Sequence, residues 1–231
     1  MLDVCADLLK ARDPLLGIAS AHVGSLGGLT ALARGECHLA GSHLLDPATR
    51  EYNLPFVREH LKGIPVRVVR LAMRKQGLVV KPGNPLGIRG WNDLVRADVG
   101  FVNRQRGAGT RVLLDVRLAD AGLDPRSIRG YAREEPTHMA VAAAVAGGVA
   151  DTGLCIEAAA RHLGLDFVPL EDEPFDLVVP EAHVAHPGVK ALLELITTEA
   201  FRRAARAMPG YDATTSGLVS LQKREGETGP G

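Results

Sequence analysis

Short apolar runs alternate with helical patterns along most of this chain. Runs typical of strands cover residues 18–23, 37–41, 66–72, 76–80, 99–102, 151–156, 166–170 and 175–179. Amphipathic or small-residue patterns typical of helices cover residues 3–11, 29–34, 54–61, 88–95, 112–121, 139–146, 157–163, 189–196 and 199–207. This alternation predicts an α/β fold with mainly parallel sheets. The polar tail from Tyr211 is expected to fray at its end.

The most informative segment is the turn from Asn103 to Arg111, which joins a predicted strand to a predicted helix. Its glycines let the backbone approach a ligand closely, and the first N–H groups of a helix have no partners within it. These donors and the helix dipole favour an anion, and three arginines in nine residues add permanent positive charge. The segment therefore predicts an oxyanion site, with a tight turn and solvated arginines as the alternative. Its spacing matches neither a P-loop nor the GxGxxG dinucleotide fingerprint.

A second glycine-rich turn, residues 24–28, lies between the predicted strand 18–23 and the helix 29–34. Ser25 stands at the expected N-cap, where its hydroxyl could serve either the helix or a ligand. Two such turns suggest that two helix N-termini face one cleft.

Composition narrows the function classes. Lys plus Arg and Asp plus Glu number 27 each, so no overall field points to nucleic acid or membrane. Aromatic residues make up 4% of the chain, too few for base-stacking platforms. The three scattered cysteines, without CxxC spacing, predict neither a disulfide framework nor a zinc site. With no signal-peptide pattern and no apolar run long enough to span a membrane, we expect a cytoplasmic protein.

Catalytic patterns are absent from the sequence. The Ser25 turn is not a GxSxG elbow, the eight histidines show no HExxH spacing, and no acid/base carboxylate pair stands out. We therefore expect a non-catalytic binding or sensing module, with no cofactor and no metal site.

Several motifs together resemble one family. They are His22-Val-Gly-Ser-Leu-Gly-Gly-Leu29, Gly35-Glu-Cys-His-Leu-Ala-Gly41, Tyr52-Asn-Leu-Pro55, the Asn103 to Arg111 turn and Asp151-Thr-Gly-Leu154. The pattern resembles the type II periplasmic-binding-protein-like domain over residues 1–212, in particular its cytoplasmic branch, which occurs with molybdopterin biosynthesis proteins and helix-turn-helix regulators.

The resemblance implies two α/β lobes that clamp a ligand between them, each a mostly parallel sheet flanked by helices. Lobe one would comprise residues 1–74 and 174–231, and lobe two residues 75–173, with crossovers at 71–80 and 167–176. The resemblance also implies molybdate or tungstate as the ligand. Two further roles stay open: an accessory domain of a molybdenum-cofactor biosynthesis enzyme, and the effector domain of a regulator without its DNA-binding part.

Ligands of open α/β sheets bind beyond the carboxyl ends of the strands. The ligand-binding residues predicted on this basis are Ser25, His43, Arg104, Arg106, Gly107, Gly109, Thr110, Arg111, His138 and Glu157. Three of them have structural alternatives: His43 as a loop-stabilising side chain, His138 as part of a helix start, and Glu157 as a partner of the helix dipole or of an arginine.

The family normally begins with a strand and a small polar turn that come before the first helix. This chain begins at that helix, so we expect either an earlier start codon or a truncated domain. The loss of a central strand would leave neighbouring ladder groups unpaired.

Overall fold

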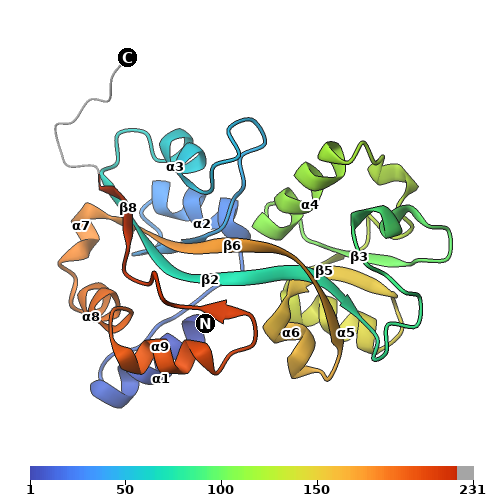
Figure 1. The fold of residues 1–231 in the computed structure, drawn as a ribbon. Coiled ribbons are helices and arrows are strands. Elements are labelled where there is room, and N and C mark those ends of the chain that lie inside the picture. Colours follow the sequence, from blue (N-terminus) through green and yellow to red (C-terminus); the bar gives the residue numbers. More distant parts are fainter. Residues whose placement is uncertain (223–231) are drawn as a thin grey trace. The chain divides into compact units, whose positions relative to one another are not determined.

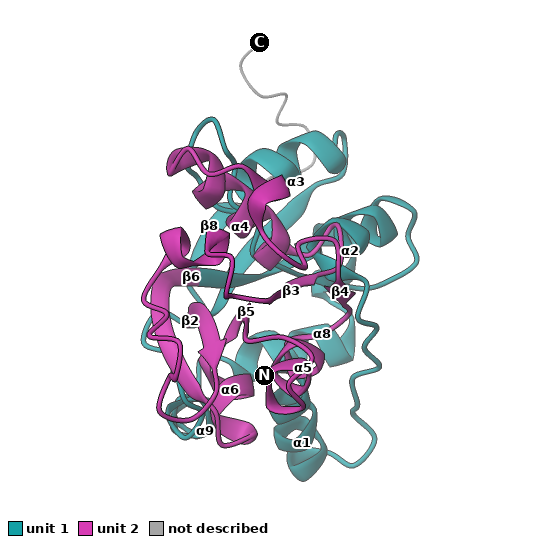
Figure 2. Ribbon diagram, turned by 90° about the vertical axis from the view of Figure 1, so that its right-hand side faces the viewer, with its two compact units in different colours: residues 1–73, 174–231 teal, residues 74–173 magenta. Residues whose placement is uncertain are grey.

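A computed structural model describes residues 1–222 of the chain. It divides into two compact units, one formed by Met1–Met73 with Pro174–Gly231 and the other by Arg74–Glu173 (Figure 2). Two long strands, β2 (Val66–Val80) and β6 (Asp166–Pro180), contribute residues to both units.

The sheet of the first unit is built on the β2 and β6 residues that belong to it. Strand β1 (Ala40–Ser42) pairs antiparallel with β6, with Ala40 opposite Val178. Strands β7 (Tyr211–Asp212) and β8 (Val219–Gln222) pair with β2. The expected fraying of the tail concerns residues 223–231, which lie outside the described residues.

Helices cover both faces of this sheet (Figure 1). On one side lie α1 (Leu2–Arg12), α8 (Pro187–Leu195) and α9 (Glu199–Arg206), and on the other α2 (Gly24–Ala33) and α3 (Leu54–His60). The short helix α7 (Glu181–Val184) follows β6 directly. The core between the sheet and α1, α8 and α9 contains fully buried Leu71, Leu177 and Phe201. Burial of such apolar side chains is the main source of stability for the unit.

In the second unit, β3 (Phe101–Arg104) pairs in parallel with β4 (Glu134–Glu135) and β5 (Thr152–Ile156). Strand β5 pairs antiparallel with β2, with Val80 opposite Thr152. Helix α4 (Gly109–Asp120) lies on one face of these strands, and α5 (His138–Ala146) and α6 (Glu157–His162) lie on the other (Figure 1). Two 3₁₀ turns, Trp91–Val95 and Pro125–Ser127, complete the unit.

Small residues set the close packing of α5 against β5. A Cβ at Gly153 would lie 2.6 Å from Cγ1 of Val141. The alanines of α5 and the glycine of β5 therefore let helix and strand approach closely.

The α/β class is confirmed, but three expectations about the strands are wrong. The sheet is mixed, because β3 pairs in parallel with β4 and β5, whereas β2 pairs antiparallel with β5 and β6 with β1. The runs 66–72 and 76–80 form one strand, as do 166–170 and 175–179. The polar residues between the runs do not break the strands, because carboxylates of β6 pair with Arg70 and Arg74 of β2.

Residues 18–23 do not form a strand. A strand needs a neighbour that accepts its N–H groups, and none of the described strands pairs with this segment. Ile18 nevertheless packs against the core of the first unit, whereas Val23 is half exposed. The apolar residues of segment 18–23 therefore suggested a strand, but in the structure the segment is only anchored to the core through Ile18.

We expect Gly77→Ala to destabilise the protein strongly. A Cβ at Gly77 would lie 2.2 Å from the carbonyl oxygen of Val168 and 2.7 Å from Cζ of Phe167. Overpacking of this kind costs about 1–3 kcal/mol or more. Urea unfolding measures the change. Gly90→Ala, whose added Cβ would meet nothing within 4 Å, is the matched control. Equal stability of the two variants would contradict the tight contact between β2 and β6 at this point.

Candidate functional site

The arginine-rich turn lies in the second unit, between the end of β3 and the start of α4. Gly107 has a φ of +81°, a conformation that other residues adopt at a cost, and Gly109 is the first residue of α4. The N–H groups of Arg111 and Val112 donate to the carbonyl of Ala108. Those of Gly109 and Thr110 come earlier in the helix, where no carbonyl within the helix is available. The turn thus has the backbone geometry that the sequence predicts.

Arg104 is the buried cation of this turn, with 7% of its surface exposed. Its Nη2 donates to the carbonyl of Pro136 at 2.9 Å and its Nε to that of Glu135 at 3.3 Å. Burial, with Arg74 nearby, lowers the pKa of Arg104 to about 10. The side chain is therefore still charged at neutral pH, and no carboxylate among the described residues forms an ion pair with it.

The other two arginines of the turn are engaged elsewhere. The side chain of Arg106 is 88% exposed and lies 3.6 Å from Glu134. Arg111 pairs with Glu134 and Asp115 at 3.2 Å each, and its guanidinium lies 4.2 Å above the ring of Tyr131. Its Nη1 also donates to the backbone carbonyl of Arg104 at 3.4 Å, so the structure gives Arg111 a role in holding the turn.

A buried polar cluster next to α4 was not predicted from the sequence. Gln76 of β2 donates to Oγ1 of Thr110 at 2.9 Å and to Oε1 of Glu173 at 2.7 Å. The Nε of Arg74 donates to the same carboxylate oxygen at 2.6 Å. Since the Thr110 hydroxyl accepts from Gln76, its own proton is left to donate. The signal was in the sequence: polar residues inside an otherwise apolar strand pattern.

Ser25 lies in the first unit, in the first turn of α2. The helix begins at Gly24 and its N-cap is Val23, so the expectation that Ser25 is the N-cap is wrong. The N-cap thus lies two residues earlier than expected, and Gly24, the first residue of the helix, has a φ of +75°. Ser25 is 2% exposed, and its Oγ has no hydrogen-bond partner among the described residues. A buried hydroxyl without a partner is costly, so it is a natural contact for a ligand.

His43 is nine-tenths buried, and its ring lies edge-on to Phe175 with centroids 6.0 Å apart. The segment that carries it is fixed by Asn53. The amide oxygen of Asn53 accepts from Oγ of Ser42 and the N–H of Leu44, both at 2.8 Å. Its Nδ2 donates to Asp176 at 2.8 Å, and Asp176 in turn pairs with Arg70.

Asn53 also has an unusual backbone conformation, with φ 63° and ψ −49°. The N–H of Leu54 donates to the carbonyl of Tyr52 at 2.6 Å, which closes a γ-turn around Asn53. This form of the γ-turn is rare and strained, and surrounding contacts must hold it. Asn53 is therefore a positioning residue for the Ser42–Leu44 segment, a role that the sequence analysis missed.

The last two predicted residues stand at helix starts in the second unit. His138 is the first residue of α5 and is half-buried, while the neighbouring Thr137 caps the helix by accepting from the N–H of Ala140 at 3.0 Å. Glu157 begins α6 and pairs with Arg161 one turn later at 3.4 Å. Glu157 thus has the arginine partner that was one of its alternatives, and its charge also suits the helix N-terminus.

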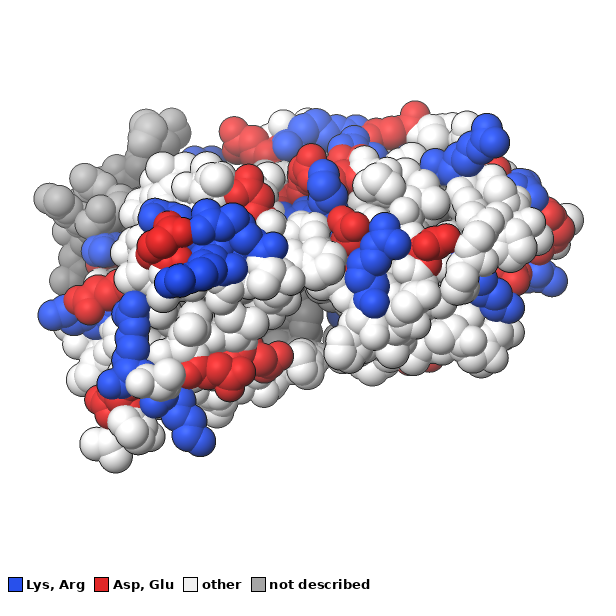
Figure 3. Space-filling model, turned by 60° about the horizontal axis from the view of Figure 1, so that its bottom comes forward, with Lys and Arg blue, Asp and Glu red and all other residues white. Residues whose placement is uncertain are grey.

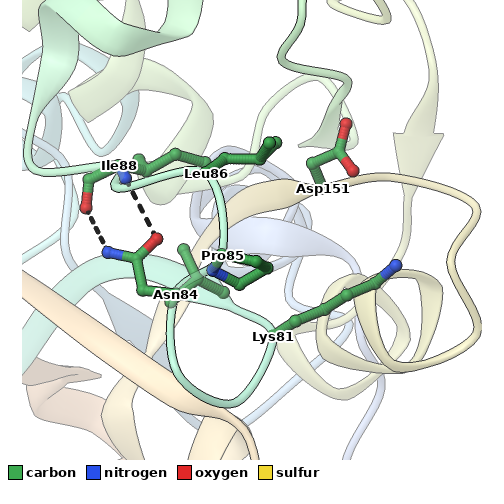
Figure 4. Close-up of a pocket in the computed structure, with 7 residues that line it drawn as sticks. Lys81, Asn84, Pro85, Leu86, Ile88 and Asp151 are labelled. Atoms are coloured by element: carbon green, nitrogen blue, oxygen red, sulfur yellow. Dashed lines mark hydrogen bonds between the residues drawn. The ribbon is translucent and has the colours of Figure 1, made fainter.

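None of the predicted residues lines the two hollows found on the second unit. One, of about 10 Å³, is lined by Val80, Lys81, Asn84, Pro85, Leu86, Ile88 and Asp151 (Figure 4). That volume suits about one water molecule. The amide of Asn84 closes this loop by donating to the carbonyl of Ile88 at 2.8 Å and accepting from its N–H at 3.0 Å. The other hollow has a volume of about 140 Å³ and is lined by Lys75, Pro169, Leu170, Glu171 and Asp172.

Two wider features bear on the class of ligand. Positive and negative side chains are interspersed on the face shown in Figure 3, in keeping with the net charge of zero. Within residues 1–222, no group of three or more His, Cys, Asp or Glu side chains could hold a metal ion. No helix in the same range is long and apolar enough to cross a membrane.

Comparison with known proteins gives a consistent result. Residues 6–197 match the family model described as PBP superfamily domain. The uncharacterized Bacillus subtilis protein YvgK is 38% identical over 201 residues, which cover 87% of this chain and 65% of that protein. This chain therefore spans about two thirds of the length of that relative. A Clostridium pasteurianum protein from the 5′ region of a 2Fe-2S ferredoxin gene is 35% identical over 109 residues, which cover 47% of this chain and 96% of that protein.

Solved structures show the same fold at low identity. A phosphate ABC transporter substrate-binding protein with bound phosphate from Clostridium perfringens superposes with a TM-score of 0.67, at 15% identity, over 89% of this chain and 91% of that one. The effector-binding domain of a BenM variant superposes with a TM-score of 0.59, at 18% identity, over 91% of each chain. Both matches extend over nearly the whole chain, so the fold is that of two-lobed binding proteins.

We expect Asn53→Ala to destabilise the protein by about 2–4 kcal/mol, because it removes three hydrogen bonds and leaves buried partners unpaired. Asn53→Gly loses the same bonds but adopts a positive φ freely, so it should be less destabilising than Asn53→Ala by about 1 kcal/mol. Urea unfolding of both variants separates the two contributions. A glycine variant as stable as the wild type would show that the amide network does not hold this segment.

Proposed function

The chain belongs to the PBP superfamily, and we propose from this premise that it binds a small oxyanion without catalysing a reaction. The observation that carries the proposal is the charge of Arg104, which is 7% exposed and has no carboxylate partner among the described residues. A buried charge is costly unless another charge or hydrogen bonds compensate it. The carbonyls of Glu135 and Pro136 supply hydrogen bonds and Glu173 interacts with the charge electrostatically, and a bound anion would add a direct negative partner.

The donors around Arg104 suit such an anion. A guanidinium has five N–H donors, and the bonds to Glu135 and Pro136 use two of them. The Thr110 hydroxyl and the first N–H groups of α4 belong to the same turn and add donors at the positive end of a helix. We assign Arg104, Thr110 and Gly109, all in the second unit, as the anchor.

Within the oxyanions we favour molybdate or tungstate, in line with the resemblance noted from the motifs. The anchor consists of donors, which match a fully ionised tetrahedral anion. Hydrogen phosphate carries a proton and needs an acceptor as well. Gln76 Oε1, which has no hydrogen-bond partner among the described residues, is the acceptor that such a proton would use. Phosphate is therefore the informative competitor, and a phosphate-bound relative in fold makes it a serious one.

We expect Arg104→Ala and Thr110→Ala each to weaken molybdate binding by about 1–3 kcal/mol, the range for hydrogen bonds to charged groups. Isothermal titration calorimetry with molybdate, tungstate, sulfate and phosphate measures the affinities. Arg126→Ala is the matched control, because Arg126 is an exposed arginine of the same unit paired with Asp124. Unchanged affinity in both anchor variants would contradict the site, and a clear preference for phosphate would contradict the choice of ligand.

The pKa of Arg104 makes a second prediction. Because that pKa is lowered to about 10, the guanidinium keeps its charge up to about pH 9 and loses it above. Anion affinity should therefore be flat between pH 7 and 9 and decline as the pH passes 10. A bound anion favours the charged form, so it should raise the pKa and move the decline to higher pH. Affinity that is equally strong at pH 11, where the fold is shown to persist by circular dichroism, would contradict the assignment.

The effector domain of a transcription regulator is a second candidate for the whole protein. The likeness to the effector-binding domain of a BenM variant favours it. An accessory domain of a molybdenum-cofactor biosynthesis enzyme is the other alternative raised by the motifs. A helix-turn-helix encoded in the same reading frame would favour the regulator, and a fused catalytic domain would favour the enzyme.

A further inference from the structure

The buried polar cluster beside α4 fixes the direction in which each of its hydrogen bonds runs. It consists of Arg74, Gln76, Thr110 and Glu173, all in the second unit and each at most 5% exposed. We infer that Arg74, Gln76 and Glu173 determine the specificity of the anion site by holding the Thr110 hydroxyl as a hydrogen-bond donor, so that fully ionised oxyanions are favoured over protonated ones. This inference rests on the proposed anion site.

The direction of the bonds is set first between Arg74 and Glu173. An arginine can only donate, and an ionised carboxylate can only accept. Nε of Arg74 donates to Oε1 of Glu173 at 2.6 Å, and Nε2 of Gln76 donates to the same oxygen at 2.7 Å. If the amide were turned over, its oxygen would face that carboxylate oxygen, and two acceptors repel each other. The Gln76 amide is therefore held with its NH₂ group toward Glu173.

The second N–H of the same amide then sets the role of Thr110. Nε2 of Gln76 donates to Oγ1 of Thr110 at 2.9 Å, so the proton of that hydroxyl has to point elsewhere. Among the described residues this proton has no hydrogen-bond acceptor. Because Thr110 is the second residue of α4, the proton adds a donor to the N–H groups at the start of that helix.

A hydroxyl held in this way distinguishes between oxyanions. Molybdate, tungstate and sulfate carry no proton at neutral pH, so all their oxygens accept hydrogen bonds. Hydrogen phosphate has an O–H group that needs an acceptor, and a hydroxyl held as a donor cannot provide it. A hydroxyl that rotates freely would serve both kinds of anion. The cluster thus contributes specificity through Thr110, without requiring Arg74 or Glu173 to contact the anion.

The first test compares the molybdate and phosphate affinities of the full chain by isothermal titration calorimetry. Arg74→Met combined with Glu173→Gln removes both charges together, so the net charge is kept and no lone charge is buried. The Gln76 amide can then turn over, and the Thr110 hydroxyl can accept. A hydroxyl released in this way has three staggered orientations, so the ratio of molybdate to phosphate affinity should fall by about threefold or more. Asn92→Met, at an exposed amide of the same unit, is the matched control and should keep the wild-type ratio.

A double-mutant cycle separates this positioning role from a merely structural one. Gln76→Met should weaken molybdate binding by about threefold or more, because the freed hydroxyl no longer points its proton at the anion. In a protein that already carries Thr110→Val, Gln76→Met should have no further effect, because the hydroxyl through which Gln76 acts is gone. Thermal melting without ligand checks that each variant is folded. If the variant without the Arg74–Glu173 pair does not fold, this cycle decides by itself.

The outcomes separate the inference from the proposed function. A wild-type protein that binds none of the oxyanions would remove both. A wild-type preference for phosphate would overturn the inference and leave the anion site in place. Molybdate binding with an unchanged affinity ratio after loss of the Arg74–Glu173 pair would overturn the inference alone. The same holds for an equal effect of Gln76→Met with and without the Thr110 hydroxyl.

Discussion

A buried guanidinium must form ion pairs or hydrogen bonds with other polar groups, and much of this structure follows from that requirement. Arg74 forms an ion pair with Glu173, and Arg70 forms one with Asp176. Arg111 pairs with both Glu134 and Asp115. The first two pairs join neighbouring strands and allow β2 and β6 to continue through polar positions. The third pair fixes the turn before α4.

Arg104 is the exception in this set, because carbonyl oxygens meet it and no described carboxylate does. Carbonyl dipoles orient a guanidinium but leave its net charge in place. Burial and the nearby Arg74 lower the pKa of Arg104. A positive charge held rigidly in a buried position is what an anion site requires, since little reorganisation is then needed on binding.

The sequence was sufficient for the features that depend on local pattern. The α/β class and the positions of most helices follow from apolar periodicity and from Gly and Pro, although α4 begins three residues before the expected Val112. The strand expected at residues 18–23 was wrong because strand formation depends on a neighbour that the pattern does not reveal. The Gln76–Thr110 contact and the Asn53 network could not be predicted, because their partners lie 34 and 123 residues away in the chain. The different roles of Arg104, Arg106 and Arg111 could not be predicted either, because they depend on which carbonyls and carboxylates of other segments lie next to each arginine.

The conformation of Asn53 limits which residues related proteins can have at this position. Positive φ is tolerated by glycine, asparagine and aspartate, but glycine brings no side-chain bonds and aspartate would face the carboxylate of Asp176. Asparagine alone offers both an acceptor for Ser42 and Leu44 and a donor for Asp176. Selection should therefore retain asparagine at this position, because it holds the fold of the segment. A comparison of related sequences would then show an invariant asparagine that need not touch any ligand.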